Sequence, residues 1–580
     1  MRTSKFSVQE ITLFLIPVIV FIIFLFYWGN IIWLKYNSLH DYVFDSGVLL
    51  DALYQIFYFH SISTIVSYIG SSPDRVIFSP LSIFHSILLL LYIQLTAVLG
   101  TTFIIYFTLR RLTGNVFVSS AFSVLYLFYF PIDGSLFYDV HAQTFFLPFF
   151  LLGFMFQSMN RKYLSIVFFL LAGMTRFPLI GIIVIYSILD FIRNFRLNRS
   201  ISDKPKFKSF LNFDIILFGL AFTVLLFEYL IEHDYYGVQV VSSGYLHVES
   251  KGILSNLSSK VITVIFFSAP FLFIVLYANE FSCILWGLFG FIFYANYSGY
   301  YFPSIFTNQY SSVFTGIIIL ILIVYLDEYY KEKYKHSGKV IFKNIFARIK
   351  NAHLTKITIA VVLFAILLEP ISPISADMGT HFNIQSYTSP GASNSTAVMQ
   401  LADLIPENAS GVLIQNDLPQ LLTYDYKINP TLIGEVLGFP SNYTSIYFNE
   451  SASIKYIFGY LGANGFLYST SGLPQYKIIQ NAISSGKYGL FGENGELVLL
   501  RRSYHGQPEL LSNREKITIL QGEMINLVNP NDHDQTMNNT DKTLYYNNDF
   551  YLLPGSYDLN LSLTQSSTNF LAYLFNQYGV

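Results

Sequence analysis

Cysteine is almost absent from this sequence, and charged residues are scarce. The single cysteine, Cys283, lies inside an apolar run, so neither a disulfide framework nor a metal site built from several thiolates is available. Charged residues make up only 12% of the 580 residues, whereas soluble proteins usually carry about a quarter. The net charge is −2, and no basic cluster is interleaved with aromatic residues as a nucleic-acid surface requires. The sequence therefore excludes an ordinary soluble protein and sets nucleic acid aside as a partner.

Long apolar runs dominate the chain instead. Hydrophobic residues make up 53% of it, and the mean hydropathy is +0.47. Residues 11–34 are long enough, at about 1.5 Å per residue, to cross a hydrocarbon core of about 30 Å. No small-residue cleavage site follows, so we expect a retained first span. Further spans are predicted over 92–109, 116–131, 142–157, 163–176, 177–193, 213–231, 261–277, 281–298, 309–326 and 355–369. Residues 1–370 thus read as a multi-pass α-helical membrane domain of about 11 transmembrane helices.

Lysine and arginine residues predict the orientation of these spans. They gather in connections that fall on one side of the topology: Arg110-Arg111, Arg161-Lys162, the run from Arg193 to Lys208, and the run from Lys331 to Lys356. Basic connections stay on the cytoplasmic side of a membrane. We therefore expect a protein of the cell membrane with a cytoplasmic N-terminus, an outer loop over residues 35–80, and an extracytoplasmic region after residue 370.

Proline residues predict where helices break. The short spans 163–176 and 177–193 meet at Arg176-Phe-Pro178, where proline ends one helix and can open the next. Ser79-Pro80 begins an apolar stretch that is longer than one span needs. We expect residues 81–91 to form a helix on the outer surface, with a second amphipathic segment over 46–59.

The region after residue 370 has the character of a soluble protein. Helices are predicted over 396–405 and 474–485 and a buried strand over 411–415. Residues 488–491 and 496–501 are expected to pair across Glu493-Asn-Gly-Glu496, because Asn-Gly is a strong hairpin signal. These elements predict an α/β domain over 395–505. From residue 515 the apolar residues alternate with polar ones, which favours a small β-rich, sandwich-like domain over 515–580.

Loop 35–80 holds three carboxylates, Asp41, Asp45 and Asp51. Phe44-Asp-Ser-Gly47 is typical of a helix start, so Asp45 has a simple structural role as a cap for the next turn. Its functional alternative is a general base at the membrane surface, which activates an acceptor hydroxyl. We select Asp45 as the first catalytic candidate and assign Asp41 and Asp51 to surface or capping roles.

A second outer loop ends in Tyr138-Asp-Val-His141. Asp139 and His141 lie two residues apart where a span begins, so both are candidates to join Asp45 in a catalytic site. The alternative is structural: Asp139 would cap the helix near Ala142, and His141 would bond to backbone at the interface. A divalent metal held by Asp139 and His141 is conceivable, but two ligands are too few to predict a metal site. The cofactor is left open.

Two further polar positions lie at the outer ends of spans. Arg176 has the planar fork that clamps a phosphate, and its alternative role is to extend its charged end to the membrane interface. Gln309, with Tyr310, is a candidate hydrogen-bonding residue for a substrate.

Several short motifs, taken in order, resemble the family known as domain of unknown function 2079, whose multi-pass prokaryotic proteins are grouped with GT-C glycosyltransferases. The motifs are Phe44-Asp-Ser-Gly47, Phe78-Ser-Pro80 leading to Gln94, Tyr138-Asp-Val-His141 with Pro148, Met174-Thr-Arg-Phe-Pro178, Ile405-Pro-Glu-Asn-Ala409, Ile414-Gln-Asn-Asp417, and the segment Tyr488 to Arg501. The resemblance covers roughly residues 35–200 and 395–505.

This resemblance implies a GT-C-like bundle with a cavity open to the outer leaflet and a polyprenyl-phosphate-linked sugar as donor. Asp45 would be the base, supported by Asp139 and His141, and Arg176, Gln94 and Gln309 would bind the substrate. The acceptor, the donor sugar and the oligomeric state are not specified by the sequence. The alternative is a non-catalytic, membrane-anchored surface or assembly protein. A transporter is less favoured, because transporters place ionisable residues at mid-membrane, whereas Asp190, Glu228 and Glu280 lie near predicted span ends.

Overall fold

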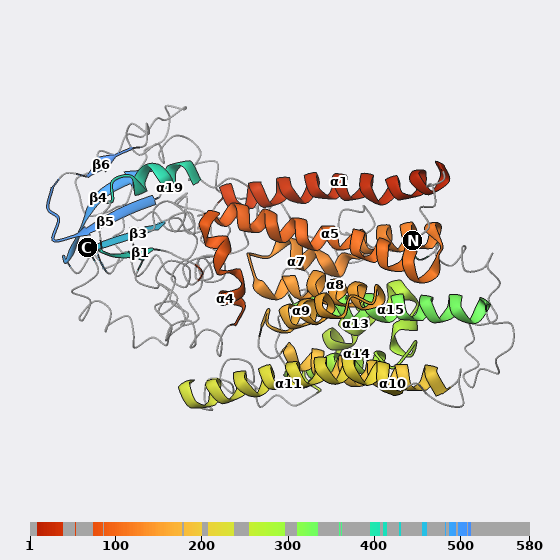
Figure 1. The fold of residues 1–580 in the computed structure, drawn as a ribbon. Helices are drawn as coiled ribbons and strands as arrows, with labels where there is room; N and C mark the ends of the chain where they lie inside the picture. Colours follow the sequence, from red (N-terminus) through yellow and green to blue (C-terminus); the bar gives the residue numbers. More distant parts are fainter. Residues whose placement is uncertain are drawn as a thin grey trace, which may run out of the picture. The chain divides into compact units, whose positions relative to one another are not determined.

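The structure is a computed structural model (Figure 1). It describes residues 8–38, 53, 73–84, 86–176, 179–199, 207–236, 254–295, 310–334, 359, 361, 363, 395–406, 410–414, 429–430, 455–460, 482, 486–494, 497–506 and 508–511. The chain divides into two compact units, one of Met1–Ser395 with Asn416–Tyr426 and one of Thr396–Gln415 with Lys427–Val580. The described elements of the first unit are helical, and all described strands lie in the second.

The helices of the first unit follow the predicted apolar runs. The α-helices are α1 (Val8–Asn37), α4 (Pro73–Phe78), α5 (Ile87–Thr113), α6 (Val116–Leu127), α7 (Asp133–Phe137), α8 (Phe146–Ser158), α9 (Lys162–Gly173), α10 (Ile180–Arg199), α11 (Phe207–Tyr236), α13 (Leu257–Ser268), α14 (Ser282–Ala295) and α15 (Ser311–Tyr334). The 3-10 helices are η2 (Ser79–Phe84), η3 (Phe130–Ile132), η4 (Ala142–Phe145), η5 (Ala269–Phe271) and η6 (Ile274–Leu276).

Only some of these helices are long enough to cross a membrane. In the described part of the chain, α1, α5, α11 and α15 contain segments that are sufficiently long and apolar, which gives four candidate spans. A fifth is added if the bent pair of α6 with the segment Phe130–Phe137 is counted as one. The count of eleven spans stays a prediction. The predicted segment 46–59 and most of 355–369 lie outside the described residues.

A tight turn makes α5 and α6 an antiparallel pair. Ser86 begins α5 by accepting a hydrogen bond from the backbone N–H of Leu89, and Gly114 ends it with a left-handed backbone, φ 68°. Asn115 then caps α6 by accepting from the backbone N–H of Val118. Gly114 therefore stops α5, and Asn115 starts α6.

Three predicted helical segments are interrupted in the structure. The span predicted over 261–277 is divided into α13, η5 and η6, with left-handed backbone at Leu272 and Phe273. The surface helix predicted over 81–91 is instead divided, because η2 ends at Phe84 and the cap at Ser86 begins α5 at Ile87. The span predicted over 116–131 is not straight: it bends by 48° after Leu127, where Pro131 lacks the N–H that a continuing helix needs.

Helix α15 is the centre of the bundle. It packs against α5, α8 and α14, and most of its apolar segment, Ser311–Lys331, is buried. A helix that is apolar all round belongs in the interior. By contrast, α1 and α11 expose rows of large apolar side chains, among them Ile19, Ile23, Phe26, Phe222 and Leu226. Exposed apolar rows of this kind match the lipid-facing surface of a membrane helix.

Helices α8 and α9 approach closely at a glycine. A Cβ atom added at Gly153 would lie 2.8 Å from ring carbons of Phe169, which is fully buried. The hydroxyl of Ser165 donates to the carbonyl of Gly153 at 2.8 Å, at the same crossing. Glycine is therefore required by packing at this position.

We expect Gly153→Ala to lower the free energy of unfolding by about 1–3 kcal/mol, the usual cost of overpacking a filled core. The measurement is thermal unfolding of the purified full chain in detergent. Gly100→Ala in α5 is the matched control, because a Cβ there meets no atom within 4 Å and alanine favours the helix by about 0.5–1 kcal/mol. Equal effects of the two substitutions would contradict the packing argument.

The second unit contains a mixed sheet and one described helix, α19 (Ser395–Ala402). The strands are β1 (Ser410–Ile414), β2 (Asn429–Pro430), β3 (Tyr456–Tyr460), β4 (Tyr488–Asn494), β5 (Leu497–Arg502) and β6 (Glu509–Leu510), in the order β2-β1-β3-β5-β4-β6. Strand β3 is parallel to β1 and antiparallel to β5, and the residues Tyr456–Phe458 of β3 and Leu497–Leu500 of β5 are buried.

The predicted hairpin is present, shifted by one residue. β4 and β5 pair antiparallel from Tyr488↔Arg502 to Asn494↔Leu497, whereas the prediction placed Asn494 in the turn. Asn494 stays in the strand because its side-chain amide donates to Ala397 O at 3.3 Å and Gln400 Oε1 at 2.9 Å in α19. Of the helix predicted over 474–485 only Ala482 is described, and it is helical. The domain over 515–580 lies outside the described residues, and the limits 395–505 stay a prediction.

Candidate functional site

Four of the six predicted site residues lie in one polar region, at the end of the bundle where α1 ends and α5 begins. They are Gln94, Asp139, His141 and Arg176. Asp139 and His141 belong to the segment 135–144, and Gln94 and Arg176 are hydrogen-bonded to that segment. Asp45 and Gln309 lie outside the described residues. We call this region the 135–144 cluster.

A buried ion pair anchors the cluster. The Lys35 ammonium, in the last turn of α1, pairs with Oδ1 of Asp139. It also donates to the carbonyl of Phe137 at 3.2 Å and lies 5.2 Å from the centre of that residue's ring. The exposed fractions are 4% for Lys35 and 0% for Asp139, so both charges are removed from water. Such a pair holds the segment onto α1, because either charge alone would be costly to bury.

Gln94 holds the backbone of the same segment. Its Nε2 donates to the carbonyl of Ser135 at 3.1 Å and, at 3.4 Å, to those of Tyr138 and Asp139. Its Oε1 accepts from the backbone N–H of His141 and the hydroxyl of Thr144, both at 2.9 Å. Both ends of this buried amide therefore bond to the protein itself, which makes Gln94 a residue that positions Asp139 and His141.

Arg176 joins the cluster through a glutamine. Its Nη1 donates to Oε1 of Gln143 at 2.7 Å, and its guanidinium lies 5.8 Å from the ring centre of Tyr310. The backbone carbonyl of Gln143 accepts from Ser312 at 3.2 Å, at the start of α15. Arg176 is half-buried, so its guanidinium is held by the protein and still reaches the surface.

The alternative prediction that Asp139 caps the helix near Ala142 is wrong. The residue at the start of η4 is His141, and no side chain caps that helix. Asp139 pairs with Lys35 instead, which lies 104 residues earlier. Sequence reasoning missed Lys35 and Gln143. The available signal for Lys35 was its position directly after the apolar run 11–34, where a lone cation at a helix end needs water or a carboxylate.

The other end of the bundle is also fixed by charges. Glu10, near the start of α1, pairs with Arg110 near the end of α5, so α1 and α5 run antiparallel. The ion pair at the opposite end of α1 is the one between Lys35 and Asp139. Glu10 and Lys35 are about seven helical turns apart. The Asn115 side chain donates to the hydroxyl of Tyr330 at 2.9 Å, which places the far end of α15 here as well. We call this the basic end, opposite to the 135–144 cluster.

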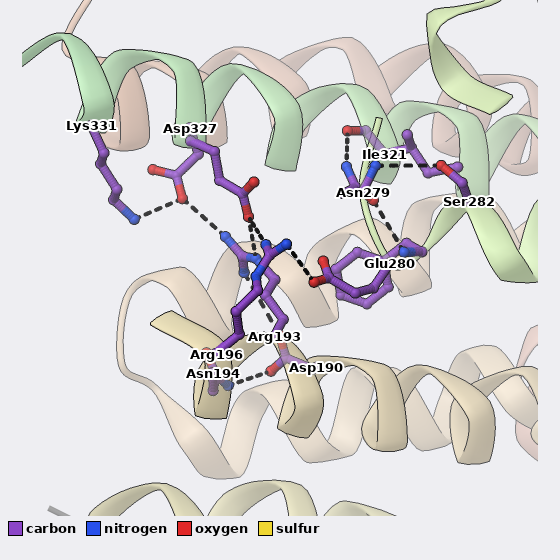
Figure 2. A network of polar contacts seen from close by, with 12 residues as sticks. Asp190, Arg193, Asn194, Arg196, Asn279, Glu280, Ser282, Ile321, Asp327 and Lys331 are labelled. Atoms are coloured by element: carbon purple, nitrogen blue, oxygen red, sulfur yellow. Dashed lines mark hydrogen bonds and ion pairs between the residues drawn. The ribbon is translucent and has the colours of Figure 1, made fainter. Parts of the chain in front are cut away.

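At the basic end, Arg193 of α10 joins three carboxylates (Figure 2). Its Nε lies 3.0 Å from Glu328 Oε1, its Nη2 lies 3.3 Å from Asp327 Oδ2, and its Nη1 lies 3.7 Å from Asp190 Oδ1. Asp327 also pairs with Lys331 at 2.7 Å. Because Asp327 and Glu328 belong to α15, Arg193 ties α10 to the central helix.

The segment before α14 joins the same network. Glu280 pairs with Arg196 at 2.8 Å, and the Asn279 side-chain amide donates to the carbonyl of Ile321 at 2.9 Å (Figure 2). Arg196 is 48% exposed, whereas Arg193 is 9% exposed at its side chain. The network therefore has a buried half around Arg193 and a solvated half around Arg196.

The 135–144 cluster together with Lys35 holds two cations, Lys35 and Arg176, the carboxylate of Asp139 and the half-buried His141. Within the described residues, no group of three or more His, Cys, Asp or Glu side chains could hold a metal ion. The chemistry that this arrangement offers is the binding of an anion near Arg176 and hydrogen bonding by His141.

A comparison of the sequence with known protein families finds none that matches, and a comparison with curated proteins finds no match either.

Proposed function

We propose that this protein is a membrane glycosyltransferase that uses a polyprenyl-phosphate-linked sugar as donor at the outer membrane face. The observation that carries the proposal is the joining of Arg176, Gln94, Asp139 and His141 through the segment 135–144, at the end of the bundle opposite to the basic end. Basic residues favour the cytoplasmic side, so the cluster would lie at the outer side. The N-terminus would then be cytoplasmic, the bundle would have about eleven spans in the cell membrane, and the second unit would be extracytoplasmic.

The reaction needs a base, a donor site and a leaving-group site. An acceptor hydroxyl attacks the anomeric carbon of the donor, the bond from that carbon to the phosphate oxygen breaks, and the polyprenyl phosphate leaves with the electron pair. Asp45 takes the hydroxyl proton as general base. The Arg176 guanidinium binds the phosphate as charge grows on it, and Gln309 binds the sugar.

The burial of Asp139 against Lys35 gives Asp139 and His141 different roles in this proposal. Asp139 is fully buried against Lys35, so it positions the segment and does not meet the substrate. His141 is half-buried and its backbone is held by Gln94. The imidazole of His141, and not the carboxylate of Asp139, can therefore reach an acceptor or a phosphate.

We expect Asp45→Asn to abolish sugar transfer in membranes that are supplied with labelled polyprenyl-phosphate sugars. The amide keeps the size and the capping oxygen of the carboxylate but cannot take a proton. Asp51→Asn, in the same loop, is the matched control and should retain transfer. The measurement is the label incorporated into acceptor, with equal amounts of each variant in the membrane. Full activity of Asp45→Asn would refute the role of Asp45, and no transfer by the unaltered protein with any donor would refute the function.

The alternative is a non-catalytic, membrane-anchored surface or assembly protein. The complete burial of the Lys35–Asp139 pair favours it, because a carboxylate that is committed to a lysine serves packing. The separation of Asp45 and His141 distinguishes the two readings: a distance much beyond about 12 Å would exclude one shared substrate.

A further inference from the structure

Two buried carboxyl groups meet between α10 and α11 at the basic end. Asp190 is 1% exposed and Asp214 is 3% exposed, and the two side chains are hydrogen-bond partners of each other. The side-chain amide of Asn194 donates to Oδ2 of Asp190 at 3.0 Å and to Oδ2 of Asp214 at 3.4 Å. Two carboxylates in hydrogen-bonding contact cannot both carry a full negative charge away from water, because each raises the cost of ionising the other.

The surrounding hydrogen bonds decide which group is ionised. The Tyr186 hydroxyl donates to Oε1 of Gln157, so the amide of Gln157 presents its Nε2, which donates to Oδ2 of Asp190. Asp190 thus accepts from two amide groups and has Arg193 within 3.7 Å. Asp214 has the Asn194 amide at one oxygen, while its other oxygen is buried without a hydrogen-bond partner. The ionised form is favoured at Asp190, and the proton belongs on Asp214.

The cations nearby do not remove the need for a proton. Arg193 is shared with Asp327 and Glu328 of α15, and in the described part of the chain no lysine or arginine forms an ion pair with Asp214. The charged groups that face this region from the neighbouring elements are Lys162 of α9, Arg193 and Arg196 of α10, Glu280 before α14, and Asp327, Glu328 and Lys331 of α15. With Asp190 and Asp214 these make five carboxyl groups and four cations, so one bound proton balances the described network.

We propose that Asp190 and Asp214 form a proton-binding pair that joins α10 to α11, so that release of the proton weakens this contact and makes the bundle sensitive to alkaline pH. With the proton bound, Asp214 donates a hydrogen bond to Asp190 and the two helices are held together. Without it, two negative charges face each other in a buried site, and Asn194 alone donates to both. The protein then has a pH-dependent link at the end of the bundle opposite to the 135–144 cluster.

The direction of the pH effect follows from which state binds the proton. The folded protein holds a proton that the unfolded chain releases at neutral pH, so the stabilising contribution is present at low pH and is lost as the pH rises. We expect the melting temperature of the purified full chain in detergent to fall by several degrees between about pH 6 and pH 9. In Asp214→Asn, whose amide donates the same hydrogen bond permanently, this fall should disappear, and the melting temperature should stay near the low-pH value of the unaltered protein.

Asp327→Asn is the control variant. It removes a carboxylate from the same network that pairs with Arg193 and Lys331 but does not contact Asp214, so it should lower the melting temperature at every pH and keep the alkaline fall. A melting temperature of the unaltered protein that does not change over this pH range would overturn the proposal, as would a full alkaline fall in Asp214→Asn.

Infrared difference spectra of the unaltered protein provide a test that does not depend on the folding of any variant. A carbonyl band of a protonated carboxyl group should be present at neutral pH and vanish over the pH range in which the fall in melting temperature levels off. Absence of that band at neutral pH would show that both groups are ionised and would refute the shared proton.

Discussion

Replacement of Arg193 by methionine is expected to lower the free energy of unfolding by about 3–5 kcal/mol, the usual cost of breaking a buried ion pair from one side. The guanidinium lies within ion-pair distance of Asp190, Asp327 and Glu328 at a 9% exposed position. Its removal leaves Asp190 and Asp327 buried without their arginine. Unfolding of the purified full chain in detergent, followed with increasing denaturant, measures the loss.

Arg196→Met is the matched control for this result. Arg196 lies one turn further along α10, pairs with Glu280 and Glu328, and is 48% exposed. Exposed pairs contribute about 0–1 kcal/mol because water solvates the charges when the pair is broken. The loss of unfolding free energy in Arg193→Lys should lie between those of Arg193→Met and Arg196→Met, because lysine keeps the charge and loses the planar fork. Equal losses in Arg193→Met and Arg196→Met would show that burial does not decide the contribution.

Replacement of Asp139 by leucine is expected to cost a similar amount, about 3–5 kcal/mol, because it leaves the Lys35 ammonium without its carboxylate at a 4% exposed site. The double variant Lys35→Met with Asp139→Leu should recover most of this loss, since apolar residues of similar volume replace a buried pair at little cost. The double-mutant cycle of the two single variants and the double variant measures the coupling.

The same double variant separates structure from chemistry. If the pair only holds the segment 135–144 in place, the double variant should be both stable and active in sugar transfer. If Asp139 takes part in the reaction directly, the double variant should be stable and inactive. A double variant no more stable than Asp139→Leu alone would contradict the assignment of Lys35 and Asp139 as partners.

Hydropathy predicts where the helices lie because burial and lipid exposure both demand long apolar runs. α1, α5 and α11 each cover a predicted run, and α15 covers the predicted run 309–326 from Ser311 onward. The breaks are harder to predict, because they depend on a few residues within a run. Pro131 bends one predicted span, and Ser86 starts α5 at Ile87, earlier than the predicted span 92–109, although both residues were visible in the sequence. Hydropathy averages over these residues, whereas helix capping and the missing proline N–H act at single positions.

The candidate site was predictable in its residue types and not in its partners. Asp139 and His141 stand out as polar residues between apolar runs, but their position in the chain does not say which charge faces them. The partner of Asp139 comes from the end of α1, and Gln94 from the second turn of α5. Such contacts follow from the packing of α1 against α5 and α7, which one sequence does not encode in any local pattern. The hairpin was displaced for the same reason, since Asn494 bonds to α19.

The ion pairs at the two ends of α1 also fix a length. Between Glu10 and Lys35, α1 rises about 37 Å at about 1.5 Å per residue, which exceeds the roughly 30 Å of hydrocarbon in an average bilayer. Because each end is fastened to another element of the bundle, α1 cannot shorten its apolar height by tilting alone. A thinner bilayer would have to thicken around the bundle, or the bundle would have to tilt as one body. For a bundle that spans a membrane, the two ion pairs would make bilayer thickness a property to which the fold is matched.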